Sequence, residues 1–98
     1  MANYVCLLQF TDQGIRAVRD TVQRAEAAKA MATKVGVKVT DVLWTLGVYD
    51  LVLLAEAKDD ESMTAYALSL AGLGNVKTQT MRAFRAKEFS AILEKMAK

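Results

Sequence analysis

Residues 46–57 read LGVYDLVLLAEA, in which a turn containing Gly47 leads into the uninterrupted apolar run Leu51–Ala55. A short run rich in leucine and valine is typical of a strand that is covered on both faces of its sheet. A domain of 98 residues has few helices with which to cover two faces. We therefore expect a second copy of the chain to cover one face, which predicts a homo-oligomer.

Three other segments have the composition of strands. Residues 4–10 alternate along the chain, and both alternating sets are apolar, which again indicates burial on two sides. Residues 37–46 are rich in β-branched and aromatic side chains. They precede the four-residue connection 47–50, so residues 37–57 are predicted to form an antiparallel hairpin. Residues 75–84 alternate only weakly, and their polarity predicts a strand at the edge of the sheet.

The segments between and after these strands have apolar residues at the spacing of an α-helix. Between Ile15 and Val35 the apolar residues recur at steps of three and four, which predicts an amphipathic helix with a fresh start at Asp20-Thr21 and a cap at Gly36. Residues 58–61 carry three carboxylates, which favour a helix N-terminus, and that helix is expected to stop at Gly72 or Gly74. Residues 86–98 place four apolar side chains on one helical face.

The predicted order is β-α-β-β-α-β followed by a terminal helix, in a single domain that spans residues 1–98. With right-handed crossovers this is an α+β protein of ferredoxin-like fold, with both main helices on one face of a four-stranded antiparallel sheet. The other face would expose more apolar surface than a soluble monomer tolerates. We therefore expect two sheets to pack face to face in a dimeric α/β barrel.

Composition narrows the possible chemistry. The chain has no histidine and a single cysteine, Cys6, so it lacks the commonest general base and the residues of a Cys/His zinc site. We expect no metal and no cofactor, and any catalysis would have to use carboxylates, Tyr, Lys, Arg or Cys6. A net charge of +2 is too small to favour nucleic-acid binding. A lone cysteine, the lack of a signal peptide and the lack of a span of ~20 apolar residues predict a cytoplasmic protein without membrane contact.

Four segments in order along the chain carry a family resemblance: residues 10–16 (FTDQGIR), 47–52 (GVYDLV), 73–76 (LGNV) and 80–84 (TMRAF). Through them the sequence resembles the GYD-domain family, small bacterial proteins with a ferredoxin-like fold among the dimeric α/β-barrel proteins. The resemblance implies a fold and gives no catalytic residues. Wider relatives include monooxygenases that act without metal, haem-degrading enzymes, isomerases and ligand-sensing domains. Haem chemistry in such relatives uses a histidine ligand, which this chain lacks.

Four residues are candidates for ligand binding. A Tyr49 hydroxyl beside the Asp50 carboxylate could orient or deprotonate a substrate, or Asp50 could bond turn amides while Tyr49 packs on the rim. Arg82 shares an alternating face with two threonines and could anchor a carboxylate or phosphate. Alternatively it is an edge-strand charge in water or a partner of Glu56 or Asp50. Trp44 could stack on an aromatic ligand or serve as a core or interface residue.

A loop group of three residues and the single cysteine are more readily explained by structure. Asp12, Gln13 and Arg16 follow the first strand, where sites are often built, but turn and helix-start chemistry accounts for them. Cys6 lies in an apolar strand and is expected to be an inert packing residue.

Three functions remain open on the sequence. The first is a homo-oligomeric module that binds a small anionic or aromatic ligand between sheet and helices, through Tyr49, Asp50, Arg82 and Trp44. The second is a cofactor-independent isomerase or monooxygenase-like enzyme that uses Asp50 or Tyr49 for proton transfer. The third is a structural or partner-binding subunit of a larger assembly.

Overall fold

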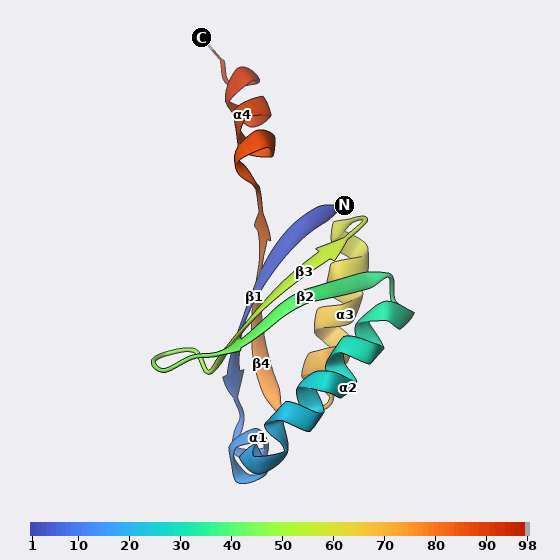
Figure 1. The fold of residues 1–98 in the computed structure, drawn as a ribbon, viewed down its shortest axis with the longest axis vertical. Coiled ribbons are helices and arrows are strands. Elements are labelled where there is room, and N and C mark those ends of the chain that lie inside the picture. Colours follow the sequence, from blue (N-terminus) through green and yellow to red (C-terminus); the bar gives the residue numbers. More distant parts are fainter. Residues whose placement is uncertain (98) are drawn as a thin grey trace.

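The computed structural model describes residues 1–97 and has the predicted order of elements (Figure 1). Its strands pair antiparallel in the order β2-β3-β1-β4, which confirms the ferredoxin-like fold and the position of β4 at an edge. The elements are β1 (Ala2–Phe10), α1 (Asp12–Arg16), a 3₁₀ turn (Val18–Asp20), α2 (Thr21–Lys34), β2 (Val37–Trp44), β3 (Leu51–Ala57), α3 (Asp60–Gly72), β4 (Val76–Ala83) and α4 (Ala86–Glu94).

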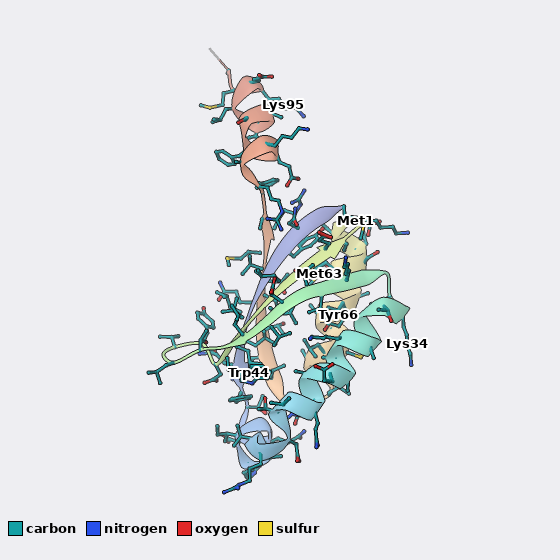
Figure 2. The ribbon with its side chains drawn as sticks, viewed as in Figure 1. Met1, Lys34, Trp44, Met63, Tyr66 and Lys95 are labelled. Carbon is teal, nitrogen blue, oxygen red and sulfur yellow. The ribbon has the colours of Figure 1, made fainter. Side chains whose placement is uncertain are left out.

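The core lies between the sheet and two helices. On one face of the sheet, alternate residues of β1 and β3 are buried, while α2 packs against β2 and α3 packs against β4. Met63 and Tyr66 of α3 are among the most deeply buried side chains, and both are labelled in Figure 2. The Tyr66 hydroxyl donates to the Ala28 carbonyl at 3.0 Å, which satisfies the buried phenol and joins α3 to α2.

No helix covers the opposite face of the sheet, as Figure 1 shows for the residues that the structure describes. We call this surface the open face. It is formed by the second alternating set of the strands, in which Val5 lies opposite Leu54 and Leu7 lies opposite Val52. Further apolar side chains extend the surface to both edges, because Leu43 on β2 is 55% exposed and Met81 on β4 is 42% exposed. Both faces of β1 and β3 are apolar, but helices cover only one of them.

The long helix expected between residues 15 and 35 is divided in the structure. The Thr11 hydroxyl accepts a hydrogen bond from the Gly14 amide, so the chain becomes helical at Asp12, before the expected start. The helix then breaks at Ala17, and α2 begins at Thr21 as the Asp20-Thr21 pair predicted, although the Asp20 side chain makes no capping hydrogen bond. The Arg24 guanidinium donates to carbonyls of the broken turn, which stabilises the break.

The other helix ends follow the expected chemistry. Asp59 caps α3 by accepting from the Ser62 amide at 2.8 Å, and Gly36 ends the preceding helical region with a φ of 76°. The terminal helix is shorter than expected and ends at Glu94, while Lys98 lies outside the described residues.

The α4 helix projects along the long axis, away from the sheet and the two packed helices (Figure 1). Its apolar stripe is exposed at Phe89, Leu93 and Met96, and Phe84 is exposed in the segment that leads to it. We call these four residues and α4 the arm. The apolar side of this amphipathic helix therefore lies exposed, with no other helix packed against it in the described part of the chain.

Candidate functional site

Asp50 extends the pairing of β3 with β1. The Phe10 amide donates to Asp50 Oδ2 at 2.8 Å, and the Asp50 amide donates to the Leu8 carbonyl at 2.8 Å. Gly47 nearby has a φ of 132°, which side-chain-bearing residues rarely adopt. These contacts agree with the interpretation of Asp50 as a residue that bonds backbone amides.

Tyr49 lies at the rim of the open face. Its hydroxyl donates to Gln79 Oε1 at 2.6 Å, and Gln79 is the open-face residue of β4 opposite Leu7. The Gln9 side chain also holds this loop, because its Nε2 donates to the Val48 carbonyl at 2.9 Å. Tyr49 therefore joins the β2–β3 loop to the far edge strand. The structure shows no hydrogen bond between Tyr49 and the neighbouring carboxylate of Asp50 among the described residues.

Trp44 lies at the end of β2, beside the same loop (Figure 2). Its indole Nε1 donates to the Thr21 hydroxyl at the start of α2, at 3.1 Å. The residue is 44% exposed, so one part of it remains accessible to a ligand or a partner.

Arg82 lies opposite Tyr4 at the other end of β1. Its guanidinium carbon lies 5.6 Å from the centroid of the Tyr4 ring and 4.5 Å from that of Phe84. One nitrogen donates to the carbonyls of Asn3 and Ala83. The other lies 3.7 Å from Glu88 Oε2, so the acidic partner of Arg82 is Glu88 rather than Glu56 or Asp50.

The four candidate residues do not meet in one place. Arg82 is level with Tyr4, whereas Asp50 contacts Leu8 and Phe10 at the far end of the same strand. Six residues of extended strand span about 20 Å. Tyr49, Asp50 and Trp44 thus gather around the β2–β3 loop, and Arg82 lies near the base of the arm.

Arg82 lines a groove of about 410 Å³ beside α3. The Tyr4 hydroxyl donates to Asp60 Oδ1 at 2.5 Å within this groove, and Thr78 and Thr80 line its β4 side. Burial and the adjacent Asp60 carboxylate raise the pKa of Tyr4 to about 12, so the phenol stays protonated near neutral pH. The sequence interpretation missed this pair because its members are 56 positions apart.

Cys6 occupies the core side of β1, where it is buried. The Thr80 hydroxyl donates to Cys6 Sγ at 3.3 Å, and burial raises the pKa of the thiol. A protonated, buried thiol is unreactive, which agrees with the packing role expected for this residue. Among residues 1–97 no group of three acidic, histidine or cysteine side chains is placed to hold a metal ion.

The β2–β3 loop also exposes apolar side chains. Leu46 is fully exposed and Val48 is 75% exposed at its tip. Together with the open face and the arm, this loop gives the chain three apolar surfaces. Such surfaces are typical of proteins that bind other proteins.

Comparison with known proteins identifies relatives over nearly the whole chain. The model of the GYD domain family matches residues 4–93. A Thermus thermophilus protein named "Glutamine synthetase and cystathionine beta-lyase binding protein" is 30% identical over 95 residues, which make up 96% of this chain and all of that protein. The crystal structure of TTHA0845 from the same species has a TM-score of 0.58 and 26% identity, covering 88% of this chain and 96% of that one.

Proposed function

The chain belongs to the GYD-domain family, and from that premise we propose that it is a homo-oligomeric binding module that docks on metabolic enzymes. Its Thermus relative is named for binding glutamine synthetase and cystathionine beta-lyase, and the match extends over the full length of that protein. We propose enzymes of these two kinds as the partners of this chain. The proposal contains no catalytic step.

The open face is the observation that carries the proposal. Val5, Leu7, Val52 and Leu54 form a continuous apolar centre on adjacent strands, and none of the described helices covers them. The border of this face carries charges of both signs, with Lys38 directly opposite Glu56. A border of mixed sign suits a self-complementary contact between two copies of one surface. A second copy on the open face leaves the β2–β3 loop and the arm for other proteins.

Native mass spectrometry with a matched pair of variants tests self-association. Leu43→Glu places a charge on the open face, and Leu68→Glu makes the same change at a 70% exposed position of α3 on the opposite side of the sheet. We expect the unmodified chain and Leu68→Glu to have the mass of a dimer or a multiple of it. Leu43→Glu is expected to shift toward the monomer. A monomeric unmodified chain would overturn the proposed assembly.

Partner binding is tested with purified glutamine synthetase and cystathionine beta-lyase from the organism that supplies the chain. We expect saturable binding of at least one enzyme to the immobilised chain. The double change Leu46→Ser and Val48→Ser, at the exposed loop tip, is expected to weaken that binding without changing the mass of the oligomer. Absence of binding to both enzymes would remove the support that the relative's name gives to this proposal.

A small anion at Arg82 is a second candidate ligand. The Arg82 side chain is 32% exposed in the groove beside α3, and the Thr78 hydroxyl lies on the same face of β4, while the Thr80 hydroxyl already donates to Cys6. Guanidinium and hydroxyl donors together suit a carboxylate or phosphate. Tyr49, Asp50 and Trp44 remain a separate proposed contact set at the loop. Raised thermal stability with inorganic phosphate or acetate, lost in Arg82→Gln, would support the Arg82 proposal.

We propose the cytoplasm as the location, because the unpaired Cys6 fits a reducing compartment. None of the helices in residues 1–97 combines the length and the apolar character that crossing a membrane requires.

A further inference from the structure

A second cavity lies on the core side of the sheet, separate from the groove at Arg82. It has a volume of about 320 Å³ and lies between α2 and the end of the sheet nearest α1. Leu8, Leu51 and Leu53 line it from the sheet, and Ala25 and Ala28 line it from α2. Alanine has only a methyl group, so α2 leaves open a space that larger side chains would fill.

The walls of this cavity are almost entirely apolar, and its polar groups belong to Thr21, Arg24 and Asn75. Arg24 Nη1 donates to the Ala17 carbonyl at 2.6 Å, and Nη2 donates to the Gly14 carbonyl at 3.2 Å. These two bonds fix the guanidinium and leave others of its five N–H groups available to a ligand. The Thr21 hydroxyl accepts from Trp44, so its own proton can be donated.

The charge at the cavity is positive. Arg24 is the only ionisable side chain among the lining residues that the structure describes. The ion pairs found within residues 1–97 are Lys29–Glu26 and Arg82–Glu88, so no carboxylate pairs with Arg24 there. Thr21 and Arg24 also belong to the first turn of the 14-residue helix α2, whose N-terminal end favours a negative charge.

We propose that this cavity binds a small monocarboxylate whose apolar body is about the size of one aromatic ring. Ligand sites commonly begin near about 300 Å³, which places this one at the lower end of the range. The apolar body would contact the leucines and alanines, and the carboxylate would accept hydrogen bonds from Arg24 and Thr21. An α-amino acid fits less well, because no acidic side chain is found among the described residues that line the cavity to pair with its ammonium group. This site is independent of docking on enzymes.

The test compares 3-phenylpropanoate with its neutral amide, 3-phenylpropanamide, and with phenylalanine. Binding is followed by shifts of the backbone amide signals in NMR titrations of the full chain. We expect 3-phenylpropanoate to shift signals of α2, Leu8 and Leu53, and to bind at least about tenfold more tightly than the amide or phenylalanine. Equal affinity for acid and amide, no saturable binding of the acid, or shifts confined to the Arg82 groove would each overturn the proposal.

Variants separate the apolar and the charged parts of the site. Ala25→Leu fills the cavity, whereas Ala30→Leu makes the same change at an exposed position of α2 outside it. We expect Ala25→Leu to abolish binding of 3-phenylpropanoate and Ala30→Leu to retain it. Arg24→Gln is expected to remove the preference for the acid over the amide, and Arg24→Lys, which keeps the charge, to retain part of it. Unchanged binding in Ala25→Leu would place the ligand elsewhere and overturn the proposal.

Discussion

The Asp50 carboxylate accepts a hydrogen bond from the backbone amide of Phe10 at 2.8 Å, which ties the β2–β3 loop to the end of β1. Asp50 Oδ2 therefore holds the backbone of the β2–β3 loop against β1. We expect Asp50→Ala to lower the free energy of unfolding by about 1–3 kcal/mol, because the Phe10 amide loses a charged acceptor. Asp50→Asn keeps an acceptor oxygen and should cost less. Urea unfolding of the three proteins measures both differences, and equal stability of all three would contradict this role.

Gly14 is the position where the structure leaves least room for a side chain. A Cβ atom there would lie 2.0 Å from the Asn75 carbonyl oxygen, which belongs to the backbone that Thr11 also contacts. We expect Gly14→Ala to destabilise the fold by about 1–3 kcal/mol or more, because the backbone must shift. Gly72→Ala is the matched control, since a Cβ atom at Gly72 would meet no neighbouring atom within 4 Å beyond its own helix backbone. The control should be neutral or slightly stabilising in thermal unfolding.

The Tyr4–Asp60 pair predicts a loss of stability at high pH. The pKa of Tyr4 is raised from 10.0 to about 12 in the folded chain, chiefly by burial and then by Asp60. The folded state therefore holds the phenolic proton more tightly than the unfolded state does. This contribution is complete below pH 10 and is lost as the pH rises toward 12.

Denaturant unfolding between about pH 9 and pH 12 checks this prediction, because the decline falls between the two pKa values of Tyr4. Tyr66, whose pKa burial also raises to about 12, contributes a slope of the same sign. Tyr4→Phe should consequently show a shallower decline than the unmodified chain, because only Tyr66 and the buried Cys6 thiol, whose pKa is also raised, then contribute. Identical slopes in the two proteins would show that Tyr4 is not held in its protonated form.

Glu88 anchors the arm to the rest of the chain. Its carboxylate accepts from the Arg85 amide at 3.1 Å and from Asn3 Nδ2 at 3.2 Å, and it pairs with Arg82. The Arg85 amide, and then Arg82 and Asn3, lower the pKa of Glu88, so its contribution is present above the ordinary glutamate pKa and is lost as the pH falls through the lowered value.

We expect Glu88→Ala to speed amide hydrogen exchange in the first turn of α4 and to leave exchange in α3 unchanged. Glu94→Ala, at the last residue of the same helix, is the control and should leave the first turn as it is. Equal exchange in Glu88→Ala and the unmodified chain would mean that other contacts hold the arm.

The sequence predicted the elements well because their signals are local. Two apolar alternating sets within residues 4–10 and 51–57 are enough to indicate strands with two apolar faces, and the order of elements then restricts the topology. The relative positions of the candidate site residues depend on the register in which the strands pair. That register joins residues that are far apart in the sequence. Only the pairing of Tyr4 with Arg82 shows that Arg82 and Asp50 lie at opposite ends of β1.

Two other features could not be predicted for a related reason. The hydrogen bond between Tyr4 and Asp60 joins a strand to a helix across the core, and no spacing in the sequence reveals it. If residues 15–35 formed one amphipathic helix, the apolar residues at steps of three and four would face the core and the charged Arg24 would be expected on the solvent side. In the structure the helix is broken at Ala17, and the Arg24 side chain donates to the carbonyls of Gly14 and Ala17 in the segment that precedes α2.

Substitution of the α2 alanines would change the cavity while leaving the rest of the fold in place. The size of the cavity depends on side chains such as Ala25 and Ala28, whereas the charge in its lining depends on Arg24. A substitution of one kind therefore need not disturb the other, and neither lies on the open face. Proteins that descend from one ancestral gene could thus change the ligand of the cavity while keeping the oligomer that is proposed to form through the open face.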